Sequence, residues 1–175
     1  LTSTGFDSIL GFDLDRRCFN WGMYIRTEGV KYNPSIFDPQ NEGGPMMLNK
    51  LHLNNVSCND NGMYISGLRS GGMLHFNGKS VNMAVELPPG THNAQPFRDG
   101  VLFNDSEADV LRYTGRGEGD EDRAMCVPKY DPEKLTNITV DKRLARAGFA
   151  RGLCKISNSL VAGGSSPSTV TLHDL

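Results

Sequence analysis

Residues 51–86, LHLNNVSCNDNGMYISGLRSGGMLHFNGKSVNMAVE, contain four short segments rich in apolar residues, separated by turns rich in glycine and asparagine. Short runs of this kind between turn signals are typical of β-strands. The turns are too short for helical crossovers, so successive strands are expected to be antiparallel neighbours. This stretch therefore predicts one four-stranded antiparallel sheet, with a sharp turn at Gly62.

The same pattern recurs along the chain. GMYI occurs at 22–25 and again at 62–65; VLFND and DVLRY follow Gly100, and LVAGG and STVTL follow Ser159. Units of about 40 residues with four short strands are the signature of a propeller blade. Twenty glycines and nine prolines in 175 residues also favour short strands and tight turns. We predict an all-β propeller-type array of about three to four four-stranded antiparallel blades.

We expect residues 1–175 to form one domain, a propeller or part of one. The first GMYI is assigned to a divergent N-terminal blade, with residues 30–45 as its exit loop. A polar insertion is placed at 115–147, between blades; inside it, residues 131–135 fit a helical turn, and residues 138–147 fit either a strand exit or a helix. A closed ring, a fragment of a larger propeller and an open array completed by a second chain all fit this length. The unfinished last repeat favours the fragment.

Three segments carry a family resemblance: His52-Leu53-Asn54, Gly90-Thr91-His92-Asn93 and Gly148-Phe149-Ala150-Arg151-Gly152-Leu153. With them, the chain resembles a family of uncharacterised bacterial propeller proteins whose blades start with His-Leu-Asn, Pro-His-Ser-Pro and Gly-Phe-Leu-Arg-Gly-Leu. The second segment departs from this pattern, because threonine precedes its histidine and no proline follows. The resemblance spans about residues 45–168. It implies a propeller fold and brings no reaction with it.

Polar side chains stand near the start of three repeats. His52 lies ten residues before the turn position of its repeat, and His92 and Arg151 lie eight residues before theirs. The first strand of each blade lines the channel of a propeller, so equivalent positions point at one axis. We therefore predict a binding cluster of His52, His92 and Arg151, with Asn54 and Asn93 beside them, for an anion or carboxylate. The alternative is that these side chains bond the backbone of neighbouring blades and lock the blades together.

No cofactor is predicted, and a divalent metal is the alternative. Metal binding by the two histidines would need a carboxylate from Asp13, Asp105 or Glu107, and a cationic arginine at the same axis disfavours it. The acidic run at 118–122 lacks the ligand spacing of a calcium loop and is flanked by arginines. A solvated loop is the better interpretation of that run.

Charge and cysteine usage narrow the class of protein. A net charge of −2 provides no basic surface for nucleic acid or an anionic membrane, and no apolar run approaches the about 20 residues of a membrane span. The cysteines are widely spaced without a C-x-x-C pair, which disfavours zinc. We expect the four cysteines to be buried free thiols rather than disulfides: Cys18, Cys58, Cys126 and Cys154. Free thiols slightly favour a reducing compartment such as the cytoplasm.

Sequence motifs of common catalytic sites are missing: there is no G-x-S-x-G, P-loop or H-E-x-x-H. We therefore hypothesise a non-enzymatic binding scaffold whose partners are other protein chains or the rest of a longer propeller, with a small anionic ligand as a further candidate. The alternative is a hydrolase or lyase for a small carboxylate or lactone-like substrate. In that case His52 and His92 are the candidate general bases and Arg151 the candidate clamp.

Overall fold

The structure, a computed structural model, describes residues 1–117, 122–134 and 147–175. Most of the acidic run at 118–122, and all but the last residue of the segment at 138–147, lie outside these residues. The described part forms two compact units, Leu1–Pro89 and Gly90–Leu175. It contains β-strands and two short 3-10 turns, Thr4–Phe6 (η1) and Pro132–Lys134 (η2), the second within the expected helical turn. No helix in the described ranges is long and apolar enough to cross a membrane.

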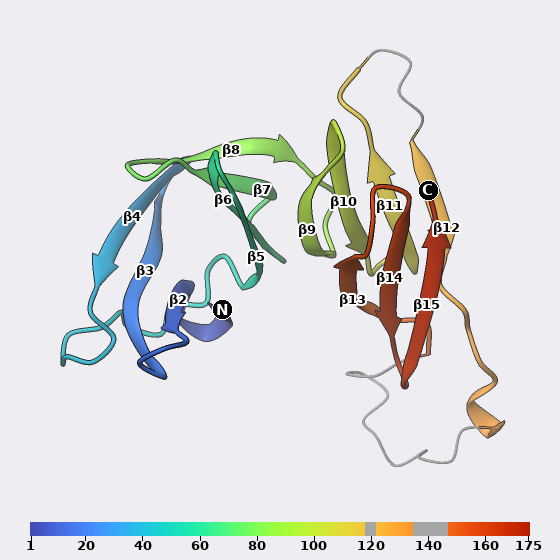
Figure 1. The fold of residues 1–175 in the computed structure, drawn as a ribbon, viewed down its shortest axis with the longest axis horizontal. Coiled ribbons are helices and arrows are strands. Elements are labelled where there is room, and N and C mark those ends of the chain that lie inside the picture. Colours follow the sequence, from blue (N-terminus) through green and yellow to red (C-terminus); the bar gives the residue numbers. More distant parts are fainter. Residues whose placement is uncertain (118–121, 135–146) are drawn as a thin grey trace. The chain divides into compact units, whose positions relative to one another are not determined.

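The N-terminal unit is one eight-stranded sheet in the order β1-β2-β3-β4-β8-β7-β6-β5 (Figure 1). It consists of two antiparallel four-stranded meanders joined between β4 and β8 by the pair Tyr32 and Val81. The first meander contains β1 (Thr2–Ser3), β2 (Ser8–Asp13), β3 (Cys18–Glu28) and β4 (Lys31–Phe37). The second contains β5 (Leu53–Asn59), β6 (Gly62–Gly67), β7 (Gly72–Phe76) and β8 (Val81–Glu86).

The C-terminal unit contains two antiparallel sheets. One has the order β12-β11-β10-β9 and the other the order β13-β14-β15. Their strands are β9 (Thr91–Phe97), β10 (Gly100–Asp105), β11 (Val110–Thr114), β12 (Arg123–Cys126), β13 (Ala150–Lys155), β14 (Leu160–Ser165) and β15 (Thr169–Asp174). The predicted class, an all-β array of three to four antiparallel blade-like sheets, is confirmed by three four-stranded runs and one three-stranded run.

Three details of the sequence analysis were wrong. Residues 31–37 of the expected exit loop form β4, and residues 123–126 of the expected insertion form β12, the fourth strand of its sheet. The two GMYI copies are not equivalent: Gly62 starts β6, whereas Gly22 is the fifth residue of β3. β4 was missed because it contains a proline, and β12 because it has only four residues and follows a polar run.

Two turn glycines have a physical reason in the close approach of a neighbouring strand. A Cβ on Gly62 would lie 2.2 Å from the carbonyl oxygen of Phe76, and one on Gly100 would lie 2.1 Å from that of Thr114. Gly62 also has a φ of 127°, which side chains disfavour. Glycine thus lets the second strand of each meander start directly against the third.

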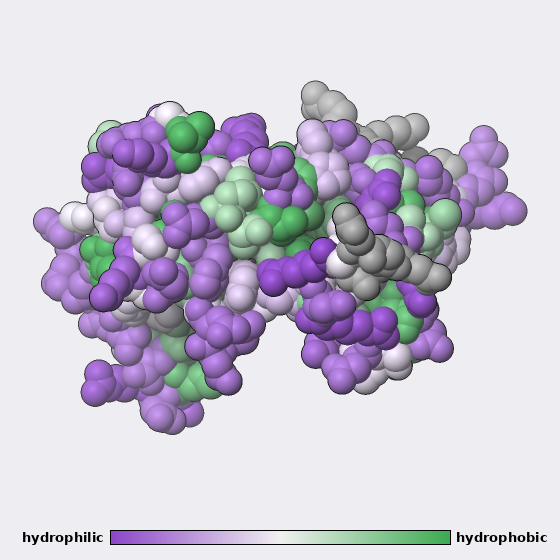
Figure 2. Space-filling model, turned by 90° about the horizontal axis from the view of Figure 1, so that it is seen from above, coloured by the Kyte–Doolittle hydropathy of each residue, from purple (hydrophilic) through white to green (hydrophobic). Residues whose placement is uncertain are grey.

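Each unit has its own apolar core. Ile9, Met23 and Ile25 of the first meander pack with Ile65 and Leu74 of the second. In the C-terminal unit, the facing sheets bury a cluster made of Phe97, Leu102, Leu111, Tyr113, Val161 and Leu175. On the face drawn in Figure 2 hydrophilic residues predominate and hydrophobic residues form small patches.

The cysteines are free thiols in the structure, but the expectation that they are buried was wrong. Cys18 is half-buried, and Cys58, Cys126 and Cys154 are exposed. Each lies within two residues of a strand end, where less of the neighbouring sheet covers the side chain.

Asp7 ties the two meanders of the N-terminal unit together. Its side chain is buried, and its carboxylate accepts hydrogen bonds from the backbone N–H groups of Lys50, Leu51 (3.1 Å) and His52 (2.8 Å). Next to it, the Thr4 hydroxyl donates to the Leu53 carbonyl at 2.7 Å. The segment that leads into β5 is therefore held by the segment that leads into β2.

We expect Gly62→Ala to lower the free energy of unfolding by at least about 2 kcal/mol, because the added methyl group clashes with the Phe76 carbonyl and the positive φ is strained. Gly78→Ala is the matched control: its φ is 95°, but nothing lies within 4 Å of the added Cβ, so its cost should be about 1 kcal/mol. Urea unfolding followed by the fluorescence of Trp21, the only tryptophan, measures both. Equal costs would contradict the steric explanation.

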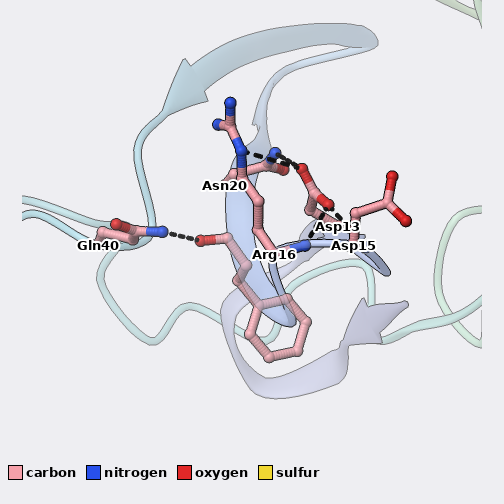
Figure 3. Close-up of polar contacts among 6 residues, drawn as sticks. Asp13, Asp15, Arg16, Asn20 and Gln40 are labelled. Carbon is pink, nitrogen blue, oxygen red and sulfur yellow. Dashed lines mark hydrogen bonds and ion pairs between the residues drawn. The ribbon is translucent and has the colours of Figure 1, made fainter.

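Removing the Asp7 carboxylate should destabilise the N-terminal unit by about 3 kcal/mol, because Asp7→Ala leaves buried backbone donors without their acceptor. Asp13→Ala removes a similar set of bonds at the surface (Figure 3), where Asp13 accepts from Asp15 N, Arg16 N and Asn20 Nδ2. Water can replace that acceptor, so the control should cost about 1 kcal/mol or less. The same fluorescence titration compares the two variants, and a larger loss with Asp13→Ala would refute the role of Asp7.

Candidate functional site

The strand bounds show which residues of the predicted cluster are structurally equivalent. Asn54, His92 and Arg151 are each the second residue of the first strand of an antiparallel meander, in β5, β9 and β13. His52 lies before β5 and is not equivalent to His92, so this part of the prediction is corrected. Asn54, eight residues before Gly62, has the spacing that His92 and Arg151 have to their own turns. The first strand is bulged near this position in all three sheets.

In the N-terminal unit, the predicted site residues are hydrogen-bonded within their own fold. His52 is half-buried, and its Nδ1 lies 2.8 Å from Asn49 Oδ1. Asn54 Oδ1 accepts from Ser66 Oγ at 3.0 Å. These bonds orient both side chains around the bulge of β5.

His92 is buried, with 7% of its surface exposed. Its Nδ1 lies 3.0 Å from the Gly90 carbonyl oxygen and 2.9 Å from Ser106 Oγ. A carbonyl oxygen only accepts, so Nδ1 carries the ring hydrogen. The Ser106 hydroxyl in turn donates to the Ala150 carbonyl at 2.8 Å. His92 therefore belongs to a hydrogen-bonded chain that runs from β9 to the start of β13.

Asn104 is a second link between the same two sheets. It is 1% exposed, and its Nδ2 donates to Asn93 Oδ1 at 3.2 Å and to the Gly152 carbonyl at 3.1 Å. Asn93 adopts a φ of 57°, a conformation that asparagine tolerates better than most residues. The sequence analysis missed Asn104 and Ser106. The signal that marks them is a run of polar residues, NDS, ending an otherwise apolar strand.

Arg151 differs from the other members because its side chain is exposed. Its guanidinium carbon lies 4.6 Å from the centre of the Phe149 ring, and that ring lies 5.8 Å from the His92 ring. Among the residues that the structure describes, Arg151 forms no ion pair or side-chain hydrogen bond. Stacking on an aromatic face leaves the N–H groups at the guanidinium edge available for an anion.

The structure thus brings His92 and Arg151 together around Phe149 in the C-terminal unit, and Asn93 is bonded to Asn104 beside them. His52 and Asn54 belong to the N-terminal unit, and their membership of the same site stays a prediction. In this arrangement the bonds of His92 and Asn93 join strands, and Arg151 is the group that can contact a ligand.

Of the three carboxylates considered as metal ligands, two have hydrogen-bond partners within the protein and the third is exposed. Asp105 accepts from Arg112 Nε at 2.9 Å, and Asp13 caps its own turn (Figure 3). Glu107 is exposed. Within the described ranges, no group of three or more His, Cys, Asp or Glu side chains is arranged to hold a metal ion.

Three side chains outside the cluster have lowered pKa values. A hydrogen bond from Tyr113 lowers the pKa of Asp99, and burial lowers the pKa of His173. A hydrogen bond with Ser35 lowers the pKa of Tyr24, with a smaller contribution from Arg26. These groups are on β3, on β15 and in the turn before β10.

Comparison with known proteins provides one structural likeness. No protein-family model matches the chain, and no curated protein matches its sequence. A catalytically inactive variant of virginiamycin B lyase from Staphylococcus aureus, solved with quinupristin, aligns with a TM-score of 0.43 and 10% sequence identity. The alignment covers all of this chain and 58% of that one.

Replacing a buried residue of the cluster by alanine should lower the free energy of unfolding more than replacing the exposed arginine. We expect Asn104→Ala to lower the free energy of unfolding by about 2 kcal/mol, because it removes buried bonds to Asn93 and Gly152. Arg151→Ala should change it by about 1 kcal/mol or less, as for an exposed side chain. Urea unfolding followed by circular dichroism compares them. A large loss with Arg151→Ala would show instead that this arginine joins the sheets.

Proposed function

We propose that this protein is a non-enzymatic binding scaffold that contacts other protein chains. The observation that carries the proposal is the use of its polar side chains: the bonds of His92, Ser106 and Asn104 hold β9 and β10 to β13. A general base has to be reachable by its substrate, and His92 is buried. Side chains arranged in this way build a rigid surface rather than a reacting centre.

The proposed contact point of this scaffold is Arg151 stacked on Phe149. The arginine is exposed at the start of β13, and the aromatic ring beneath it restricts its motion. Arginine and aromatic residues are enriched among the residues that dominate binding energy in protein interfaces. The arginine edge would pair with a carboxylate of the partner, and a small anionic ligand could use the same group.

A hydrolase or lyase remains the alternative function, and one observation favours it. Arg151, Phe149 and His92 form a continuous series of contacts, so a carboxylate substrate held by Arg151 would lie near an imidazole. This function requires His92 to become accessible when substrate binds. A lactone or ester would be the substrate class, with Arg151 as the clamp.

The proposal is tested by capturing partners from extracts of cells that make the protein, then purifying the partner and titrating it directly. We expect Arg151→Ala to weaken the measured Kd at least about tenfold. Lys155→Ala is the matched control, because Lys155 is another exposed cation on β13, and it should leave the Kd nearly unchanged.

A second assay addresses the alternative function with para-nitrophenyl acetate and γ-butyrolactone as substrates. The scaffold proposal expects no turnover above background. Turnover by the wild-type protein that disappears in Arg151→Ala, with no partner that binds directly, would establish the enzyme instead.

A further inference from the structure

The backbone of residues 49–52, which lead into β5, is fixed by hydrogen bonds to the start of the chain. Asp7 accepts from three of their N–H groups, and the Asn49 N–H donates to the Gly5 carbonyl at 3.1 Å. Asn49 and His52 have φ values of 48° and 54°, in the left-handed region where asparagine and histidine are enriched. The segment therefore holds the side chains of Asn49 and His52 in set directions.

The turn between β6 and β7 lies against this segment and carries Arg69. Ser70 is 2% exposed; its Oγ accepts from the Gly67 N–H at 3.1 Å and lies 2.6 Å from the Gly72 carbonyl oxygen. The Arg69 N–H donates to the Leu51 carbonyl at 3.0 Å. Gly67 permits this approach, because a Cβ there would lie 2.5 Å from the Leu51 carbonyl oxygen. Arg69 is thus presented by a fixed turn.

Arg69 and His52 bond the same residue, Asn49. Arg69 Nη1 donates to the Asn49 carbonyl at 2.9 Å, and His52 Nδ1 lies 2.8 Å from Asn49 Oδ1. An amide oxygen only accepts, so Nδ1 carries a hydrogen. Neither side chain forms another hydrogen bond or an ion pair within residues 1–117, 122–134 and 147–175. Nε2 of His52 and the other guanidinium N–H groups of Arg69 are thus available to a ligand.

The charge around this pair of side chains is positive. Lys50 and Arg69 are exposed, and neither is in an ion pair with a residue of the described part of the chain. Asp7, the carboxylate in contact with the segment, is 1% exposed and already accepts three backbone N–H groups. An anion that reaches Arg69 and His52 therefore meets cationic and N–H groups.

We propose that Arg69 and His52 form a binding site for a small oxyanion, either a carboxylate or a tetrahedral oxyanion. The edge of the guanidinium pairs with two of its oxygens, and Nε2 of the protonated imidazole donates to the anion. The proposal goes beyond the scaffold function, uses residues of the N-terminal unit alone and does not depend on Arg151.

Protonation of His52 is part of this binding. A neutral imidazole with its hydrogen on Nδ1 presents a lone pair at Nε2, which repels an anion, whereas the protonated ring presents an N–H group. Imidazoles titrate between about pH 5 and 8. The affinity for the anion should therefore rise as the pH falls through this range. The charged neighbours of His52 are Asp7, Lys50 and Arg69, and an added anion offsets the repulsion between the two cations and the protonated ring.

Titrations of the whole chain with sodium acetate and with sodium sulfate test the site, at an ionic strength held constant with sodium chloride. Both probes keep their charge between about pH 6 and about pH 8, so a change in affinity reports on the protein. We expect saturable shifts of the NMR signals of the His52 ring, with binding at least about fivefold tighter at about pH 6 than at about pH 8. The tighter probe identifies the class of oxyanion.

Variants separate anion binding from a structural role of these side chains. Arg69→Gln should weaken binding at least about tenfold, and Arg69→Lys, which keeps the charge, should weaken it less. His52→Asn retains a residue that tolerates positive φ and should remove the pH dependence. Lys79→Gln is the matched control, because Lys79 is an exposed cation in the turn between β7 and β8, and the affinity should not change.

Four outcomes would each overturn the proposal. They are the absence of saturable binding for both probes, equal wild-type affinities at the two pH values, a pH dependence that persists in His52→Asn, and a loss of binding in Lys79→Gln as large as in Arg69→Gln. Circular dichroism of each variant checks that it has folded before it is titrated.

Discussion

Hydrogen bonds from buried side chains to the backbone around the start of β5 and β13 hold neighbouring meanders together within each unit. In the N-terminal unit, Asp7 and Thr4 bond the backbone that leads into β5. In the C-terminal unit, Ser106 and Asn104 bond the carbonyls of Ala150 and Gly152 in β13. The first strand has no ladder partner on its inner side, so these backbone groups would otherwise be buried without partners, at a cost of about 1–3 kcal/mol each.

This constraint accounts for the unusual backbone conformations near the strand starts. Asp7, His52 and Asn93 have φ values of 47°, 54° and 57°. A left-handed residue turns the chain so that its N–H or side chain faces the neighbouring segment, and the hydrogen bonds gained there offset the strain. β5, β9 and β13 are also bulged near their second residues, which increases the local twist and re-aims the side chain. The polar residues at the strand starts are thus explained first by the backbone.

The sequence predicts the strands best where glycine turns separate apolar runs, as at β5 to β7 and β9 to β11. There the hydrophobic pattern and the turn chemistry agree. It fails at β4, which contains a proline, and at β12, which has only four residues beside a polar run, so pairing with a neighbour is what identifies them as strands. In the candidate site, residue types and spacing located His92 and Arg151. Asn104, Ser106 and Asp7 were not found, because their importance depends on carbonyl and amide groups that are distant in the sequence.

The second residue of the first strand is buried in one sheet and exposed in another, depending on whether a neighbouring sheet covers it. His92 on β9 is buried because β13 and Phe149 pack over it. Arg151 takes the equivalent position on β13, and no further sheet covers it within the described residues, so it is exposed. Val170 and Leu172 on the same sheet are exposed for the same reason. The equivalent position is therefore part of a link between sheets on β9 and is exposed on β13.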